Sequence, residues 1–520
     1  MSTRRWLVVI VGLGAVLRLF PIWFGLPYMG ARPDEEVSTG IARHMLATGD
    51  FNPHFFHWPS LTFYVFAAVH RAGSAIVRAG GFSSGLTDGQ HIIICRAVVA
   101  CAGSATLILL FSVGRRVAGE TVALVATALL AVAVLHVRDS HFAMTDVLMT
   151  FLVTASIACL VRAIDTRRPW EITWWFALAG TAGGLATSTK YNAAAVLAAM
   201  AAAQACVIAR GSRGLSPSAW APPVVFMLAF ALAFLAATPY ALLDYNRFSA
   251  DVRFDFTHLS EGHVVDLGRG WIYHATYSLP YGAGPAVFAA SIPGAILLAR
   301  NAPHQTLILG GFVVALYGSL GSGYTVFFRY ILPLVPILCL MAAVSVVAAA
   351  EWIARGTKIS RQVAYAFALA LAVAPGLINS IWFDWLLART DTRVLARRWL
   401  ESHIGPGDSV FDGGGTYASI DLSNIPVARL PSDGRADWLI LSESPVFSYA
   451  RVVPEMRELA RRQYLEMTVV AATGQRRGWA VYDLQDAFFL PVWGFWTVER
   501  PGPTLRIYRR KPLDVRGSAE

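Results

Sequence analysis

Long apolar runs separated by short polar groups dominate the chain before about Asp384. A helix needs about 20 apolar residues to cross a bilayer. Segments close to that length predict eleven transmembrane helices, at roughly 6–27, 92–114, 117–136, 146–163, 172–189, 191–209, 221–240, 276–299, 305–321, 331–350 and 362–383. The pattern therefore predicts a polytopic α-helical membrane domain over residues 1–383, followed by a soluble domain over residues 384–520.

One further apolar segment, residues 60–81, carries His70, Arg71 and Arg78, and we expect it to lie in the membrane interface as an amphipathic helix. The basic residues test this choice, because cytoplasmic loops are enriched in Lys and Arg. With eleven spans and a cytoplasmic N-terminus, the cytoplasmic groups would be Arg4–Arg5, Arg115–Arg116, Arg162 with Arg167–Arg168, Arg210 with Arg213, Arg300, and Arg355 with Lys358 and Arg361. A twelfth span at 60–81 would move Arg115–Arg116 outside, so the charge pattern favours eleven.

This orientation assigns the polar chemistry to the outer face of the cytoplasmic (inner) membrane. The first outer loop would be long, over residues 28–90. The other outer segments would be residues 136–146, the turn at Lys190, residues 243–277 and residues 321–330. The soluble domain would also be extracytoplasmic.

The soluble domain alternates short apolar runs with helical patterns. Ser409–Phe411, Trp438–Leu441 and Leu505–Tyr508 predict strands, and Val453–Tyr464 predicts a helix. A small α/β domain is the natural interpretation. The glycines at 413–415 lack the GxGxxG spacing of a dinucleotide site.

Composition narrows the functional classes. The chain is 56% hydrophobic and 15% charged, against about 25% charged in soluble proteins. Its net charge of +10 could suggest nucleic-acid binding, but the basic residues sit in small groups between apolar runs, as the positive-inside rule distributes them. The five cysteines lie in apolar runs and form no disulfide framework. Arg4–Arg5 precede an apolar run without a small-residue cleavage site, which predicts a retained signal anchor.

Candidate acids stand at the outer ends of the predicted helices. Asp34 and Glu35 follow Pro33, which is also a good first turn of a helix. Functionally, such a carboxylate can take the proton of an acceptor hydroxyl in glycosyl transfer. Asp146 begins a span and could cap it. Together with the first pair, it could also hold a divalent cation or orient substrate groups.

Candidate cations stand at the same boundaries. Lys190 and Arg329, which precedes Tyr330, could snorkel to the interface or bind a phosphate. Arg18 and Arg96 lie within the outer halves of spans, where an unpaired guanidinium is costly. Each therefore needs an anionic partner, either a loop carboxylate or a lipid phosphate.

The remaining candidates come from two outer segments. Arg138 and His141 precede Asp146 and could contact substrate. Glu261 and His263 are two residues apart, and with Asp146 they could ligate a divalent metal, or they could be polar residues that contact substrate. The sequence predicts no certain cofactor and leaves a divalent metal ion open.

Several of these elements occur in the order seen in a known enzyme class. They are Pro33–Glu35, Trp58–Leu61, Arg138–Asp146, Gly184–Ala186 running to Lys190–Tyr191, Glu261–His263, Arg329–Tyr330 with Leu332–Pro333, and Asp391–Arg393 with Trp399. In these elements the chain resembles the GT-C glycosyltransferases. It is most similar to glycosyltransferase family 39, which includes the protein O-mannosyltransferases, and to the lipid A aminoarabinose transferases.

The resemblance implies an inverting transferase whose donor is a sugar on a polyprenyl phosphate. Asp34 would be the catalytic base, and Glu35 and Asp146 would shape the site or help bind a cation. Lys190 and Arg329 would hold the donor phosphate. The acceptor would be a lipid, a glycan or a protein. Ser60 stands where relatives often carry a second proline, and the tail does not resemble the MIR domain, which weakens the protein-acceptor interpretation.

Two other classes compete with the enzyme. A transporter or flippase of lipid-linked sugars would keep polar groups near the membrane midplane and often shows internal repeats. The sequence has no evident repeat, and most of its charge lies in the outer loops. A catalytically inactive scaffold is the third class, against which the presence of Asp34 and Asp146 argues.

Overall fold

The computed structural model describes residues 2–81, 85–210, 217–423, 425–427, 436–474 and 478–512. Arg213, residues 82–84 of the predicted first outer loop and residues 513–520 of the predicted soluble domain lie outside them. The chain divides into two compact units. The helical unit contains Met1–Ile22 and Asp34–Ile381, and the C-terminal unit contains Trp23–Pro33 and Trp382–Glu520.

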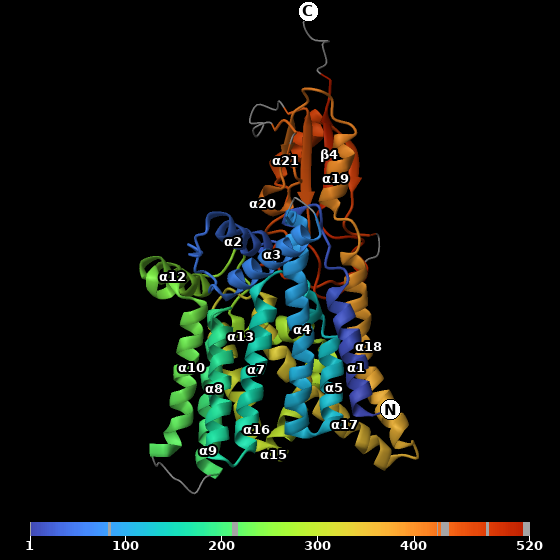
Figure 1. The fold of residues 1–520 in the computed structure, drawn as a ribbon. Helices are drawn as coiled ribbons and strands as arrows, with labels where there is room; N and C mark the ends of the chain where they lie inside the picture. Colours follow the sequence, from blue (N-terminus) through green and yellow to red (C-terminus); the bar gives the residue numbers. More distant parts are fainter. Residues whose placement is uncertain are drawn as a thin grey trace, which may run out of the picture. The chain divides into compact units, whose positions relative to one another are not determined.

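Long helices run side by side through the helical unit (Figure 1). They are α1 (Thr3–Leu19), α4 (Asp88–Ala118), α5 (Glu120–Ala131), α7 (Thr145–Asp165), α8 (Pro169–Thr187), α9 (Val196–Arg210), α10 (Ala221–Ala237), α15 (Pro285–Asn301), α16 (Pro303–Gly321), α17 (Val335–Gly356) and α18 (Arg361–Leu387), which continues into the C-terminal unit. Small residues allow close packing: a Cβ atom at Gly180 or Gly184 of α8 would collide with the backbone carbonyls of Phe226 and Phe230 in α10.

Shorter helices connect these elements. They are α2 (Glu35–Thr48), α3 (Leu61–Ala79), α6 (Val134–Asp139), η2 (Tyr191–Ala195), η3 (Pro217–Trp220), α11 (Tyr240–Leu243), α12 (Tyr245–Glu261), α13 (Gly270–Tyr273), η4 (His274–Ser278), α14 (Leu279–Ala283) and η5 (Phe328–Leu334). Figure 1 shows α12 lying crosswise beyond the end of α10. Segments that the sequence leaves as outer loops are thus largely helical.

Six helical segments of the described chain are long and apolar enough to cross a membrane, or seven if one bent pair counts as a span. They are 88–118, 145–165, 191–210, 303–321, 328–356 and 361–401. Helices α5 and α10 are apolar but shorter. The predicted total of eleven spans stays a prediction.

Two predicted spans need correction. The segment expected as one span at 276–299 is a helix pair bent by 108°. Gly284, with φ 98°, ends the first helix and Pro285 begins the second. The span expected at 6–27 ends at Leu19, because Pro21 and Pro27 cannot supply the amide hydrogens that a continuing helix needs.

Helix α3 forms where the sequence predicts the interfacial helix. It is not among the described helices that are long and apolar enough to cross a membrane. Its position in the interface stays a prediction, since it depends on a bilayer.

A four-stranded sheet forms the core of the C-terminal unit, in the order β1-β2-β4-β3. Its elements are η1 (Met29–Ala31), α19 (Thr392–Glu401), β1 (Val410–Asp412), α20 (Gly415–Ala418), β2 (Trp438–Glu443), α21 (Pro454–Gln463), β3 (Tyr464–Val470), η6 (Phe495–Thr497) and β4 (Thr504–Arg510). β1 pairs parallel to β2, and the other pairs are antiparallel. Alternate residues of β2 pack on the two faces: Trp438 and Ile440 against α19, and Leu439 and Leu441 against α21.

The three strands and the helix predicted in this region are confirmed, and the helix ends at Gln463, one residue before the predicted end. The sequence reading misses β3, whose first residue was assigned to that helix. Leu465, Met467 and Val469 alternate with Glu466 and Thr468, and this period of two is the signal that could have revealed the strand.

Residues 23–33 pack within the C-terminal unit, although they precede it by most of the chain. Arg32 Nη1 lies 2.6 Å from Asp486 Oδ1, and both side chains are buried. Tyr28 donates its hydroxyl to the carbonyl of Ser419 at 3.0 Å, and its ring lies 4.5 Å below the guanidinium of Arg393. Through these polar contacts, residues 23–33 form part of the C-terminal unit.

Candidate active site

Asp34 stands at the start of α2 with an accessible carboxylate. Its φ of 71° lies in the left-handed region, which Asp tolerates better than most residues. The side chain is 28% exposed, and its Oδ2 atom lies 3.2 Å from Arg329 Nη2. The positive end of α2 also favours a negative charge here. The arrangement presents a charged carboxylate that a substrate group can reach.

Glu35 is the neighbour of Asp34, but its environment is the opposite. It is fully buried, and Arg96 binds it through two bonds, Nε to Oε1 at 3.0 Å and Nη2 to Oε2 at 2.6 Å. The amide of Ala143 donates to Oε1 at 2.7 Å. The anionic partner that Arg96 requires is therefore Glu35. Because the guanidinium holds both oxygens, this geometry does not support the predicted role of Glu35 in binding a cation, and Arg96 is equally closed to a substrate phosphate.

Lys190 and Asp146 form a second, nearly buried ion pair. Lys190 Nζ lies 2.5 Å from Asp146 Oδ1, with the two side chains 15% and 2% exposed. Asp146 comes from the first turn of α7, and Lys190 from the turn after α8. Burial lowers the pKa of Lys190, and the charge of Asp146 opposes that shift. Asp146 Oδ2 has no hydrogen-bond partner among the described residues.

Arg329 and Tyr330, adjacent in η5, join the two ion pairs. Arg329 pairs with Asp34, and Lys190 Nζ lies 4.6 Å from the centroid of the Tyr330 ring. Segments distant in sequence thus bring together two carboxylates, two cations and a phenol. These five residues are called the Asp34 cluster below.

Arg18, Arg138 and His141 are enclosed within the helical unit rather than presented on its surface. Each is fully buried. Arg138 Nη1 pairs with Asp139 at 3.0 Å, and His141 lies 2.9 Å from each of two backbone carbonyls. Arg18 donates to the carbonyls of Gly14, Leu130 and Ala131. The substrate contacts expected of these three residues are not supported by this geometry, in which they join helices and turns.

The predicted metal ligands are not brought together. The ring of His263 packs against His258 and Phe327, at 5.0 and 5.1 Å between centroids, and Asp146 is paired with Lys190. Within the described ranges, no group of three or more His, Cys, Asp and Glu side chains could hold a metal ion. Glu261, His263 and Asp146 therefore do not form a ligand set in this part of the chain, and a divalent cofactor stays a prediction.

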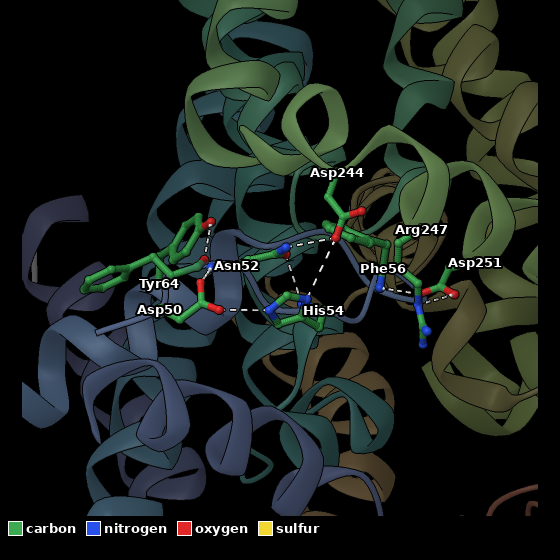
Figure 2. A network of polar contacts seen from close by, with 9 residues as sticks. Asp50, Asn52, His54, Phe56, Tyr64, Asp244, Arg247 and Asp251 are labelled. Carbon is green, nitrogen blue, oxygen red and sulfur yellow. Dashed lines mark hydrogen bonds and ion pairs between the residues drawn. The ribbon is translucent and has the colours of Figure 1, made fainter. Parts of the chain in front are cut away.

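A polar network that the sequence does not predict joins residues 50–58 to Asp244 and to α12, which follows it (Figure 2). Asn52 Nδ2 donates to Asp244 Oδ2 at 2.8 Å, and His54 Nε2 lies 2.9 Å from Asp50. The amide of Phe56 donates to Asp251 at 2.8 Å. The density of carboxylates between residues 244 and 255 is the signal that could have indicated this network.

The network continues toward the Asp34 cluster. His57 Nδ1 lies 3.0 Å from Asp255 Oδ1, and this hydrogen bond raises the pKa of His57. Burial raises the pKa of Asp255, while His57 opposes the shift. Tyr191, the residue after Lys190, donates its hydroxyl to the carbonyl of Phe56 at 2.8 Å. One hydrogen bond thus separates this loop from the chain segment that carries Lys190.

Comparison with known proteins gives a sequence match and a fold match. Residues 82–248 match the family model of dolichyl-phosphate-mannose-protein mannosyltransferase, a segment that contains Asp146 and Lys190. The fold matches the crystal structure of ArnT from Cupriavidus metallidurans in the apo state, with a TM-score of 0.53 and 15% identity over 98% of both chains. The chain resembles the GT-C membrane glycosyltransferases.

Two further structures share this GT-C fold. ArnT from Cupriavidus metallidurans bound to undecaprenyl phosphate matches with a TM-score of 0.50 and 18% identity, over 76% of this chain and 73% of that one. The apo oligosaccharyltransferase of Archaeoglobus fulgidus gives a TM-score of 0.51 and 13% identity, over 78% and 59%. The chain thus spans less than two thirds of the archaeal protein. No curated protein sequence matches the chain. The fold is that of a multi-pass membrane protein with a small C-terminal sheet.

Proposed function

We propose that this protein is an inverting glycosyltransferase that moves a sugar from a polyprenyl-phosphate donor to an acceptor at the outer face of the cytoplasmic membrane. The observation that carries the proposal is the Asp34 cluster, in which an accessible carboxylate lies beside two cations. The resemblance to transferases whose names include a dolichyl phosphate, and to ArnT bound to undecaprenyl phosphate, supports the donor class.

The ion pairs suggest how the donor would assemble the site. Lys190 and Arg329 each bind a carboxylate, and the phosphate of the donor would compete for both cations. A phosphate offers strong charge-assisted hydrogen bonds, and Arg can bind it through two donors at once. When Arg329 turns toward the phosphate, Asp34 loses its counter-ion and becomes a better base. Donor binding would therefore activate the carboxylate that accepts the proton.

The reaction then balances with residues of this chain. The acceptor oxygen attacks the anomeric carbon while its proton passes to Asp34. The bond from that carbon to the phosphate oxygen breaks, and the polyprenyl phosphate leaves with the electron pair. Lys190 and Arg329 stabilise the negative charge that develops on the leaving group. Attack opposite to the departing phosphate inverts the anomeric carbon.

The domain and orientation expectations complete the proposal. Residues 1–383 would form the transmembrane catalytic domain and residues 384–520 the soluble domain. The basic cytoplasmic connections support a cytoplasmic N-terminus and an extracytoplasmic C-terminal domain. Membrane lipids, the lipid-linked donor and a lipid, glycan or protein acceptor would be the partners, without nucleic acid.

The test is transfer from a panel of synthetic polyprenyl-phosphate sugars by purified protein in detergent, with and without a chelator. Because a general base contributes about 10²–10⁴-fold, we expect Asp34→Asn to reduce turnover by that factor while donor binding persists. Asp50→Asn, at a more exposed carboxylate outside the Asp34 cluster, is the matched control. Wild-type turnover in Asp34→Asn would show that Asp34 is not the base. Turnover with and without the chelator shows whether the reaction needs a divalent metal ion.

One observation favours a second function, a flippase or transporter of lipid-linked sugars. The pair 270–283 and 285–301 is bent by 108°, and discontinuous helices often form the binding sites of transporters. Saturable donor binding without turnover on any acceptor, combined with movement of the donor across proteoliposomes, would support this function instead.

A further inference from the structure

The C-terminal unit carries a groove lined by arginines that the function proposed above does not use. It has a volume of about 840 Å³ and lies along α21, beside the end of β2. Its lining includes Ser444, Phe447, Arg451, Arg457 and Arg461. This groove is called the arginine groove below.

Three arginines line the groove. Arg457 and Arg461 are four residues apart on α21, so they occupy the same face of the helix. Arg451 precedes the first residue of that helix and lines the same groove. All three side chains are exposed. The spacing can therefore engage more than one negative group on the same ligand.

The acidic residues of the groove are already neutralised by other contacts. Glu443 binds Arg457 at 2.6 Å and Arg506 at 3.5 Å. Glu458 binds Arg462, which points from the same helix, at 2.5 Å. By contrast, the side chains of Arg451 and Arg461 form no ion pair with any residue that the structure describes. The groove therefore holds uncompensated positive charge with its hydrogen-bond donors available to a ligand.

The groove also offers an apolar surface and a hydroxyl. Phe447 is 46% exposed, and an aromatic ring of this kind can pack against the C–H face of a sugar ring. Ser444 Oγ accepts a hydrogen bond from the amide of Val446 at 3.2 Å, which leaves its own hydrogen to donate. Arginine, an exposed aromatic ring and a hydroxyl in one groove suit a ligand that is both anionic and saccharidic.

We propose that the arginine groove binds a saccharide bearing carboxylate or phosphate groups, which is the acceptor, or part of it, for the transfer reaction. The identification of this saccharide as the acceptor rests on the proposed function, whereas binding by the groove does not. Arg451 and Arg461 would bind the anionic groups, and Phe447 would contact the ring between them.

Calorimetry on the full-length protein in detergent tests the binding. Tetragalacturonate is the probe. Its neutral methyl ester tests whether binding needs the negative charge, and inorganic phosphate tests whether binding needs the saccharide. We expect tetragalacturonate to bind more tightly than either control, and its affinity to fall as salt is added. Equal binding of the methyl ester, no binding of tetragalacturonate, or tighter binding of phosphate alone would each overturn the proposal.

Matched variants locate the site. The double variant Arg451→Gln with Arg461→Gln removes both uncompensated charges from exposed positions, and we expect it to weaken tetragalacturonate at least tenfold. Arg398→Gln, at an exposed arginine of α19 outside the groove, should bind as the wild type does. Unchanged affinity in the double variant would overturn the assignment to the arginine groove.

A kinetic comparison separates this proposal from the proposed function. With an anionic acceptor, the double variant should raise KM for the acceptor at least tenfold while kcat and donor affinity stay unchanged. Binding of tetragalacturonate without turnover under any condition would contradict the transferase function but not saccharide binding by the arginine groove. Turnover with an unchanged acceptor KM in the double variant would contradict the acceptor role of the groove and leave the transferase standing.

Discussion

Adjacent carboxylates in this protein occupy opposite environments. Asp34 is 28% exposed and pairs with one guanidinium nitrogen, whereas Glu35 is fully buried and held by Arg96 and a backbone amide. A base needs access to the proton that it removes, and a buried carboxylate with all its hydrogen bonds made is better suited to holding structure. The proposed catalytic role of Asp34 and the structural role of Glu35 thus follow from their different burial and hydrogen bonds.

Replacing Glu35 should therefore affect stability before chemistry. Glu35→Gln leaves the charge of Arg96 buried without a counter-ion, which costs about 3–5 kcal/mol. We expect a lower thermal unfolding midpoint of the purified protein in detergent, measured by tryptophan fluorescence. Asp34→Asn should lower the midpoint less, because Asp34 and its partner Arg329 are both more exposed than Glu35 and Arg96. Equal midpoints for the two variants would contradict the structural role of Glu35.

If Lys190 binds the donor phosphate as proposed, the affinity for the donor should depend on pH. Burial lowers the pKa of Lys190 below the usual value of about 10.4, so the ammonium group loses its proton at a lower pH than an exposed lysine. As pH rises through this lowered pKa, we expect donor affinity to fall. Lys190→Arg should abolish the fall, because a guanidinium stays charged. The measurement is donor affinity between pH 7 and pH 10, and a parallel decline in both proteins would contradict the assignment.

Sequence reasoning identified the polar residues of the site but not all their contacts. The cost of a charge inside a span was enough to predict an anionic partner for Arg96, and Glu35 is that partner. The same argument predicted an anion for Arg18, whose guanidinium donates to three backbone carbonyls, one in α1 and two at the end of α5. The packed fold determines which backbone carbonyls an arginine can reach, and no residue type in the sequence predicts them.

At the scale of elements, residues 50–58 and α12 form a clamp whose strength should depend on pH. The hydrogen bond to Asp255, with the charge of Asp251 adding to it and Arg247 opposing it, raises the pKa of His57. The protonated pair therefore contributes stability that is complete below the ordinary histidine pKa of about 6.5 and is lost as pH rises through the raised pKa.

We expect the amides of residues 50–58 to exchange hydrogen faster above that window, after correction for intrinsic rates. In His57→Asn, the corrected exchange rate of these amides should not increase across this pH range. The amides of α7, which contains no histidine, provide the internal reference. A step of equal size in the variant would assign the pH dependence to another group.

Helix boundaries were predictable where glycine or proline interrupts an apolar run, and less so elsewhere. Gly284–Pro285 carries the signal for the break between α14 and α15, although the apolar run on both sides favoured a single span. Strand β3 follows α21 directly, with no glycine or proline to mark where the helix ends and the strand begins. Helix α12 was predicted as a loop because its many charged residues conceal its length. In each case, contacts with residues distant in sequence determine which secondary structure forms.

At the scale of the whole molecule, the C-terminal unit depends on residues 23–33. Removing one member of the buried pair, as in Arg32→Gln, should destabilise this unit by about 3–5 kcal/mol. Limited proteolysis should then cut the C-terminal unit faster than in the wild type. Replacing both members, Arg32→Met with Asp486→Leu, should recover most of the resistance, because no unpaired charge remains. Resistance of Arg32→Gln equal to that of the wild type would contradict the role of this ion pair.

The position of residues 23–33 in the chain also determines when the C-terminal unit can fold. Residues 23–33 leave the ribosome early, yet their partners begin at Trp382, roughly 350 residues later. At about 5–20 residues per second, the wait is roughly 20–70 s. During that interval Phe24 and Arg32, both buried in the finished protein, have no binding site to occupy. The C-terminal unit can therefore be completed only after translation has passed through nearly every membrane helix, which makes its folding the last step of the protein's biogenesis.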